Sequence, residues 1–477
     1  MLRIALACFA LTAALSAQGQ TWVVDAAAGA GSNFSTLQAA VDAAQDGDRI
    51  LVRPGSYGST SIQGKDLVVV AERASGLEVR LGALQVSSIA LGQQLVLTGF
   101  AIEGAQAGPT SGQLLAQDVA LAVSDCGGEV YVEHCALRGA PGALPSQGAG
   151  LGLDGQPAAR LTGAFSVQFE RCELSGGDGA LSTDACSGAG APALDALDSR
   201  VALHTTTLSG GAGALHGSCP GASCAGTAAG AGVRLAGATT QAYLSSAHMQ
   251  GGDAPHCGGA SLSAPGLVVG GAHIDWIQSS AVGGAGAPDV DGLVVPKANS
   301  HRGLRLYSPL GAGHVGGFGF EGEPGDVALL FYALDSVGPF SLPGILGAQL
   351  LSQPILFGAF PVGASGESVV PFAAPPLGPG LPSFSVVLQP AFVDLTPPPG
   401  GFGLQVGALR SLVLLNAALS PTGFPDCNLN GTPDLVELTC GLAADCNQNG
   451  RPDACDIADG SSADQNADGV PDECQGG

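Results

Sequence analysis

Carboxylates and amides recur at a fixed spacing near the carboxyl end of the chain. The segments "DCNLNGTPDLVE", "DCNQNGRPDACD" and "DQNADGVPDECQ" begin at Asp426, Asp445 and Asp464, so their starts are 19 residues apart. A fixed period of this kind indicates serial units. Oxygen-bearing side chains at loop positions 1, 3, 5 and 9, with glycine at position 6, are typical of a tight loop around a calcium ion. The sequence therefore predicts three calcium-binding repeats in residues 425–477.

The predicted calcium ligands occupy loop positions 1, 3, 5, 7, 9 and 12, with only the backbone carbonyl used at position 7. They are Asp426, Asn428, Asn430, Thr432, Asp434 and Glu437 in the first loop; Asp445, Asn447, Asn449, Arg451, Asp453 and Asp456 in the second; and Asp464, Asn466, Asp468, Val470 and Asp472 in the third. The third loop has Gln475 where an acid belongs, so we expect it to bind most weakly. Calcium prefers such an all-oxygen cage, whereas zinc would prefer thiolates.

Proline stands at position 8 of each loop, where a paired EF-hand would donate an amide to its partner loop. Proline has no amide hydrogen, so these are not paired sensor EF-hands. The repeats resemble the serial calcium loops of thrombospondin type 3 repeats and dockerins, with cysteines interleaved at Cys427, Cys440, Cys446, Cys455 and Cys474. The resemblance implies constitutive stiffening by calcium at about 0.1 to 1 mM, as in extracellular modules. The dockerin likeness implies an alternative, docking of the tail onto a partner module.

The composition and the N-terminus predict an exported protein. A net charge of −24 makes nucleic acid and anionic membranes poor partners, because neutralising phosphates needs a basic surface. The start "MLRIALACFALTAALSAQGQ" predicts a signal peptide over residues 1–17, and no later segment is long and apolar enough to span a membrane. Without Cys8, twelve cysteines remain in a compartment that permits disulfides. Their connectivity cannot be deduced from the sequence.

The segment "FSTLQAAVDAAQDGDRILVRPGSYG" predicts a short helix, a strand and a turn. Ser35 and Gln38 form a capping-box start, while Leu37, Ala40, Val41 and Ala44 share one helical face that ends at Gly47. A buried strand over residues 49–53 and a Pro-Gly turn follow. This order resembles the entry of the pectin-lyase-like right-handed parallel β-helix family. The resemblance implies a helix that covers the open end of the coil.

Five segments between residues 95 and 252 align without gaps, which predicts stacked coils. Their anchors are Ile102, Leu137, Leu174, Leu208 and Met249. Apolar or small residues precede each anchor by seven, five and two positions, so one three-residue step interrupts the alternation of a strand, and a glycine two residues later permits a turn. A sixth segment ending at Ile274 keeps the spacing. We expect disulfides among the loops that carry Cys186, Cys219, Cys224 and Cys257, and expect Cys135 and Cys172 to be core residues.

Three outward positions on consecutive coils carry side chains that could be catalytic: Glu133, Glu170 and His204. Two adjacent carboxylates and a histidine suit acid–base or nucleophilic sugar chemistry, or calcium binding. The alternative is an ordinary solvated row of polar residues. The chain lacks the several calcium-binding aspartates with a basic residue that are typical of family members that cleave acidic polysaccharide.

From about residue 300, apolar runs separated by Pro/Gly clusters predict a β-sandwich over residues 300–420, with Phe357, Phe360 and Phe402 in its core. The predicted fold is all-β, with a β-helix over residues 21–299, the sandwich and the repeat tail. The predicted function is that of a secreted or cell-surface calcium-binding protein whose β-helix binds carbohydrate or an extracellular protein without catalysis. The alternatives are a polysaccharide lyase or glycoside hydrolase, and docking through the tail.

Overall fold

The computed structural model describes most of the chain, with gaps. The described residues are 19–72, 78–104, 119–142, 154–180, 188–214, 228–254, 262–334, 336–340, 345–347, 349–378, 380–419, 426–428, 430, 432–447 and 449–475. The predicted signal peptide and Cys186, Cys219, Cys224 and Cys257 lie outside these residues.

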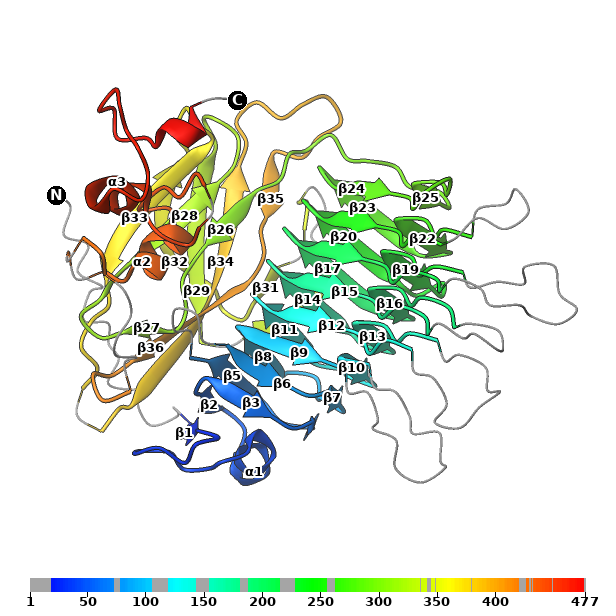
Figure 1. Ribbon diagram of the computed structural model, residues 1–477, viewed down its shortest axis with the longest axis horizontal. Helices are drawn as coiled ribbons and strands as arrows, with labels where there is room; N and C mark the ends of the chain where they lie inside the picture. Colours follow the sequence, from blue (N-terminus) through cyan, green and yellow to red (C-terminus); the bar gives the residue numbers. More distant parts are fainter. Residues whose placement is uncertain are drawn as a thin grey trace, which may run out of the picture.

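Three parallel sheets run side by side along the first part of the chain (Figure 1). Sheet A consists of β1 (Thr21–Val24), β2 (Asp48–Val52), β5 (Leu67–Ala71), β8 (Gln94–Thr98), β11 (Glu129–Glu133), β14 (Ser166–Glu170), β17 (Arg200–His204), β20 (Gln241–Ser245) and β23 (His273–Ile277). Sheet B consists of β3 (Gly55–Tyr57), β6 (Val79–Leu81), β9 (Phe100–Glu103), β12 (Ala136–Arg138), β15 (Glu173–Ser175), β18 (Thr207–Ser209), β21 (His248–Gln250) and β24 (Ser280–Val282). Sheet C consists of β4 (Thr60–Gln63), β7 (Leu84–Ser87), β10 (Leu121–Ser124), β13 (Ala159–Thr162), β16 (Leu194–Leu197), β19 (Val233–Ala236), β22 (Leu267–Gly270) and β25 (Val290–Asp291). One strand from each sheet makes one coil of a parallel β-helix, so the predicted fold is confirmed.

The predicted anchors of the coil stack as expected. Ile102, Leu137, Leu174, Leu208 and Met249 are successive partners in sheet B, and all are buried in the interior of the β-helix. Cys135 and Cys172 are buried in the same core, as predicted. The glycines two residues after the anchors serve a different purpose from the one predicted: a Cβ at Gly139 would lie 1.8 Å from the backbone oxygen of Gln156. They allow close approach of two backbones rather than a turn.

The three-residue step between sheets A and B corresponds to a bend in the left-handed backbone conformation. The bend residue is Gly99 in one coil, and His134, Arg171, Thr205 and Ser246 in the next four, with φ between 46° and 54° for the four that are not glycine. Non-glycine residues adopt this conformation rarely. Its repetition in consecutive coils indicates that the stacked strands on either side impose it.

Two features of the coil differ from the prediction. The sixth segment is out of register, because Ile274 pairs with Ala242 in sheet A, whereas the partner of Met249 in sheet B is Ala281. Sheet C was also missed, because from β10 to β22 its four-residue strands lie beyond the long insertions that follow the strands of sheet B. In a strand of four residues that stands alone in the sequence, the alternation of apolar and polar residues is too short to distinguish the strand from a loop.

The helix α1 (Leu37–Ala43) covers the N-terminal end of the β-helix, where Leu37, Ala40, Val41 and Ala44 join the core, as predicted. Its N-cap is Thr36 rather than Ser35: the Thr36 hydroxyl accepts a hydrogen bond from the Ala39 amide. Gln38 does not complete a capping box. Its side chain bonds instead to the backbone of Ser61 in β4, which ties the helix to the coil.

Beyond the β-helix, two further sheets pack face to face around a second core of Leu and Phe residues. Sheet D consists of β26 (Gly303–Arg305), β28 (Val315–Glu321) and β33 (Glu367–Ala373). Sheet E consists of β27 (Leu310–Gly311), β36 (Arg410–Leu415), β34 (Ser383–Val393), β29 (Val327–Ala333) and β32 (Ile355–Pro361), with β35 (Leu404–Val406) paired to β34. β30 (Ser336–Phe340) and β31 (Gln349–Leu351) form a hairpin. All these pairs are antiparallel except β27 with β36. We refer to this unit as the sandwich.

The sandwich lies against the outer face of sheet A rather than at the end of the β-helix (Figure 1). A third apolar cluster fills the contact: Val68, Val96 and Tyr131 of sheet A pack with Leu409 and Val413 of the sandwich. The interface therefore covers the face on which the catalytic row was predicted.

The tail folds as three loop–helix units beside sheet D. They contain α2 (Asp434–Cys440), α3 (Asp453–Asp459) and the 3-10 helix η1 (Asp472–Cys474). Val436 and Cys440 of α2 are buried in the core of the sandwich. Two disulfides connect successive repeats, Cys427 with Cys455 and Cys446 with Cys474. The odd cysteine of the tail is Cys440, whose burial raises its pKa.

Candidate functional site

The predicted row occupies neighbouring positions on sheet A. Glu133 pairs with Glu170, and Glu170 pairs with His204, so the register is the predicted one. The predicted exposure is wrong, because these three residues are 0%, 2% and 5% exposed. β36 of the sandwich covers the two glutamates.

Arg410, at the start of β36, neutralises the two carboxylates. One of its guanidinium nitrogens lies 3.0 Å from Oε1 of Glu170, and Nε lies 3.9 Å from Oε2 of Glu133. The backbone amide of Ser411 donates to Oε1 of Glu133 at 3.1 Å. Arg410 itself is 1% exposed and also donates to the backbone oxygens of Leu304 and Leu306. The row and the sandwich are thereby joined through a buried ion-pair cluster.

Burial sets the protonation of this cluster. It raises the pKa of Glu133 to about 7 and raises that of Glu170, in both cases against the opposing charge of Arg410. Burial lowers the pKa of His204 to about 3, with the positive charges of His301 and Arg410 acting in the same direction. His204 is therefore neutral at physiological pH.

A second group of polar contacts continues the interface from Glu170. Arg171 lies 2.8 Å from Glu321 of β28, which also pairs with Arg305 at 3.2 Å. Burial alone would raise the pKa of Glu321, but a hydrogen bond to His301 and these two guanidinium groups lower it to about 2. The ring of His301 contacts Ser245 through Nδ1 at 2.9 Å. Consecutive coils of sheet A are thus each held by a polar side chain of the sandwich.

Arg410 and His301 were missed by the sequence analysis. The sequence did contain an indication that Arg410 has a buried partner. Arg410 is the one charged residue in the apolar run "LRSLVLLN", and a lone charge in a buried strand needs a partner. His301 had none, because it lies in a loop of ordinary composition.

The first tail loop brings its predicted oxygen ligands together. The amide of Asn430 donates to Oδ1 of both Asp426 and Asn428, at 3.1 and 3.0 Å. Across the loop, the side-chain amide of Asn430 lies 2.7 Å from Oε1 of Glu437. Asp434 accepts the backbone amide of Cys427 at 2.9 Å. Positions 1, 3, 5 and 12 therefore face a common centre, and position 9 closes the loop.

The second loop repeats this geometry. Asp445 accepts the amides of Asn449 and Gly450 at 3.1 and 2.8 Å, and the side chain of Asn449 lies 2.7 Å from Asp456. Arg451 pairs with Asp456 at 3.5 Å and also with Asp459. The side chain of Arg451 therefore neutralises an acid of the loop. The sequence analysis assigned only the backbone carbonyl of Arg451 to the calcium site and did not predict this ion pair.

The third loop differs at its last position. Asp464 accepts the amides of Asp468 and Gly469 at 3.1 and 2.9 Å, as in the other loops. Gln475 donates from its side chain to both oxygens of Asp468, at 2.8 and 3.0 Å. Oδ2 of Asp472 is buried and has no hydrogen-bond partner among the residues that the structure describes. An amide donor therefore occupies the position that an acid holds in the first two loops.

The donor set of the tail fits calcium better than a soft metal. Asp434, Glu437, Asp453 and Asp456 are 6% exposed or less. Buried carboxylates are costly unless a cation or hydrogen-bond donors compensate them, and oxygen ligands of this kind suit calcium. A carboxylate oxygen of Asp434 lies close to the sulfurs of Cys427 and Cys455, and one of Asp453 lies close to the sulfurs of Cys446 and Cys474. Both cysteine pairs form disulfides. These sulfurs are therefore not thiolate ligands.

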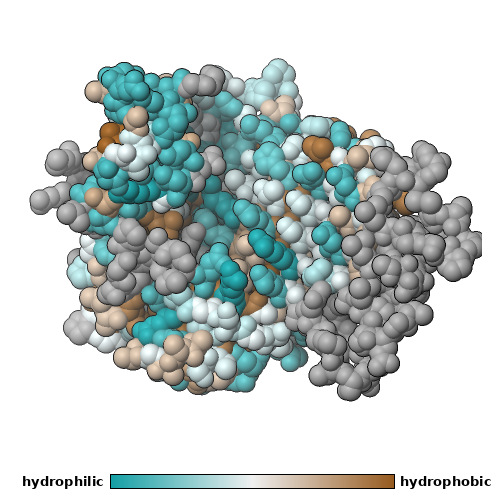
Figure 2. All heavy atoms as spheres, in the orientation of Figure 1, coloured by the Kyte–Doolittle hydropathy of each residue, from teal (hydrophilic) through white to brown (hydrophobic). Residues whose placement is uncertain are grey.

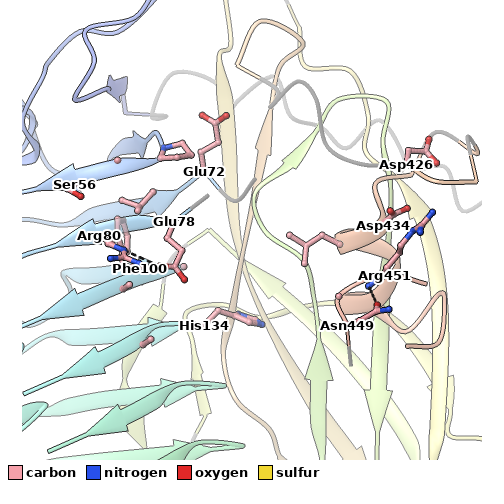
Figure 3. A pocket seen from close by; sticks show the side chains of 18 of the residues that line it. Ser56, Glu72, Glu78, Arg80, Phe100, His134, Asp426, Asp434, Asn449 and Arg451 are labelled. Carbon is pink, nitrogen blue, oxygen red and sulfur yellow. Dashed lines mark hydrogen bonds and ion pairs between the residues drawn. The ribbon is translucent and has the colours of Figure 1, made fainter. Parts of the chain in front are cut away.

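A cleft of about 1610 Å³ separates the tail from the first coils of the β-helix (Figure 3). Glu72, Glu78, Arg80 and His134 line it on the side of the β-helix, and Asp426, Asp434, Asn449 and Arg451 line it on the side of the tail. Figure 2 shows hydrophilic side chains gathered where the two halves of the molecule meet on this face. The first two predicted calcium loops thus form one wall of this cleft.

No protein-family model matches the chain, and no curated protein matches it. Among solved structures, it is similar to a mutant pectin methylesterase in complex with a hexasaccharide, at 16% identity and a TM-score of 0.27, over 57% of this chain and 92% of that chain. It is also similar to a pectate lyase, at 10% identity and a TM-score of 0.27, over 55% of this chain and 69% of that chain. At these values neither likeness carries an argument about activity or substrate.

Among the described residues, no helix is long and apolar enough to cross a membrane.

Proposed function

We propose that this protein is an exported, calcium-binding protein that binds an extracellular carbohydrate or protein without cleaving it. The cleft between the tail and the β-helix is the proposed binding surface. The signal-peptide pattern and the two disulfides of the tail support an extracellular location, since disulfides persist in oxidising compartments.

The burial of Glu133 and Glu170 beneath Arg410 carries the non-catalytic part of the proposal. A catalytic carboxylate must reach the substrate, and these two are 0% and 2% exposed and engaged with the sandwich. His204 is buried beside them and neutral, so it is not available as an imidazolium acid at physiological pH. The row is better explained as the ionic part of a module interface than as the active site of a lyase or hydrolase.

The tail loops carry the calcium part of the proposal. Positions 1, 3, 5, 9 and 12 of the first two loops would hold the ion, with the carbonyls of Thr432 and Arg451 at position 7. Calcium would supply the positive charge that offsets the buried acids and would stiffen the wall of the cleft. The packing of α2 in the sandwich core supports stiffening over docking, because that helical face is already occupied within the chain.

An assay of wild type and Glu170→Gln on a panel of polysaccharides tests the non-catalytic part. We expect neither protein to release unsaturated or reducing ends from these polysaccharides. Affinity electrophoresis on the same panel measures binding of carbohydrate, and capture of extracellular proteins measures binding of protein. Release of ends by wild type that is lost in Glu170→Gln would overturn the proposal in favour of the enzyme.

Calorimetric titration of the full chain with calcium tests the metal part. We expect saturable binding at about 0.1 to 1 mM. The double variant Asp445→Ala, Asp456→Ala should lose the second site, whereas Asp154→Ala, at a surface position of the β-helix, should titrate like wild type. Absence of heat in wild type at millimolar calcium would refute calcium binding.

A further inference from the structure

A second cavity, of about 490 Å³, lies between sheet A and the sandwich, away from the tail. Its floor is the outer face of β14, β17, β20 and β23, and its opposite wall includes Leu346, Phe402 and Val406 of the sandwich. This volume is within the range of small-molecule sites, which often lie between domains. The cavity shares no residue with the proposed binding cleft.

The floor of the cavity includes one small outward side chain, that of Ala202. Ala202 is paired with Gln168 on one side and Tyr243 on the other, and Tyr131 pairs with Gln168 one strand further on. A methyl group therefore stands between the longer side chains of Gln168 and Tyr243. The sandwich contacts both of these neighbours, since Gln168 bonds to the backbone of Leu409 and the hydroxyl of Tyr243 accepts from Gln405, whereas the cavity lies above Ala202.

The wall of the cavity that belongs to the sandwich is apolar and fixed. The amide of Val406 donates to the oxygen of Leu346 at 2.8 Å, which joins their two segments. The side chain of Asn299 forms two hydrogen bonds of 3.0 Å with the backbone of Phe402, one to its oxygen and one from its amide. Phe402 was predicted to be a core residue of the sandwich, but its partly exposed side chain faces this cavity instead. An aromatic ring and two branched side chains are thereby held in place without a ligand.

The floor carries cationic and polar groups. The guanidinium of Arg200 lies 4.8 Å above the ring of Phe165 and has no ion-pair partner among the residues that the structure describes. Asp275, an acid on the floor, is paired with Lys297 at 3.2 Å. His273 is exposed beside them. Because Lys297 compensates Asp275, the guanidinium of Arg200 is the one charge on this floor without an ion-pair partner within the described part of the chain.

We propose that this cavity binds a small organic acid, with an apolar ring as its body and one carboxylate. The ring lies over Ala202 against Phe402 and Val406, and the carboxylate accepts hydrogen bonds from Arg200. The apolar wall opposite a cationic floor favours this class of ligand over a sugar, whose hydroxyl groups would find few partners on the wall. This inference does not depend on the proposed function of the cleft.

Ligand-observed NMR and calorimetry with benzoate and naphthoate, each compared with its neutral amide, test the proposal. We expect both acids to bind saturably and their amides to bind at least about tenfold more weakly, because the amide lacks the charge that Arg200 recognises. Failure of every acid to saturate up to roughly 10 mM would overturn the proposal, as would binding of glucose or mannose in their place.

Three variants locate the binding. Ala202→Tyr reproduces the side chain of the neighbouring strand and fills the cavity, so it should abolish binding; Ala202→Leu, which is smaller, should weaken it. Arg200→Gln should remove the preference for the acid over its amide. Ala122→Tyr, at an outward alanine of β10 in sheet C, adds the same bulk elsewhere and should bind like wild type. Unchanged binding in a folded Ala202→Tyr protein, judged by its thermal unfolding midpoint, would contradict the assignment.

Discussion

Two regions of this molecule gather carboxylates, and they differ in what compensates the charge. On the outer face of sheet A, Glu133 and Glu170 are buried against Arg410, a cation fixed within the chain. In the tail, residues 426–474 contain eleven acids against one base, Arg451, and four of the acids in the first two loops are 6% exposed or less. Both sets were recognisable in the sequence as candidate sites.

The comparison shows that the role of a cluster of acids depends on the groups that cover it. The acids of sheet A have an internal counter-ion and hydrogen bonds from β36, so they hold two modules together. The acids of the tail have backbone amides and one exposed arginine, which leaves room for an external cation. Removing the compensating charge from each region is the direct way to test this difference.

Replacing Arg410 with methionine should have the largest effect. The change leaves Glu133 and Glu170 buried without their cation, and breaking a buried pair in this way costs about 3 to 5 kcal/mol. Urea unfolding, followed by circular dichroism, measures the loss. Arg234→Met is the matched control, because it breaks an exposed pair with Asp195 and should cost at most about 1 kcal/mol. Equal losses in the two variants would contradict the role given to Arg410.

Removal of calcium should have the next largest effect, and only on the tail. If the loops bind at about 0.1 to 1 mM, then about 10 mM calcium stabilises them by about 1.4 to 2.7 kcal/mol relative to chelator. Limited proteolysis with and without chelator, read by mass spectrometry, should show new cleavage within residues 426–475. The β-helix serves as the internal control, since its cleavage should not change. If chelator does not change the cleavage pattern, then the acids of the tail need no external cation, and the two regions do not differ in this respect.

The pH dependence of Glu133→Gln should be smaller and has a defined sign. The pKa of Glu133 is raised to about 7 from an ordinary value of 4.5, so the folded state holds the proton more tightly than the unfolded state. Wild type should therefore lose stability as the pH rises from about 5 to about 7, whereas the glutamine variant lacks this contribution. Between pH 5 and pH 8 the difference is on the order of 2 kcal/mol. Unfolding of both proteins at pH 5 and pH 8 measures it; a constant difference would show that Glu133 does not titrate in this range.

Much of the β-helix could be predicted because its repeat leaves a strong pattern. The five anchors from Ile102 to Met249 share a spacing that only stacked coils explain, and the structure pairs them in that order. The register failed at Ile274, because the sixth segment was aligned without the glycine that follows the other anchors; the true partner of Met249 is Ala281, and Gly283 stands two residues after it. Periodicity fixes a register only while neighbouring coils have comparable strands.

The burial of the row that was predicted to be catalytic could not be predicted from the row itself. Glu133 and His204 occupy outward positions, and nothing local distinguishes an exposed outward residue from one covered by a distant module. A signal did exist in an earlier strand: β5 has the sequence LVVVA, and a strand that is apolar on both faces must be covered on both. The residues that cover it, such as Arg410, lie more than 200 residues further along the chain.

The smallest predicted effect concerns the third tail loop, and it sharpens the comparison within the tail. Gln475 donates to Asp468 where the first two loops have an acid, so Gln475→Glu should add a carboxylate ligand and strengthen the calcium affinity of that loop by about tenfold. The converse change, Asp456→Gln, should weaken the second loop by a similar factor and free Arg451 from one of its two acids. Calcium titrations of both variants, in the full chain, report the two loops separately. If Gln475→Glu gains no affinity, then position 12 does not reach the ion, and the loop geometry proposed for all three repeats is wrong.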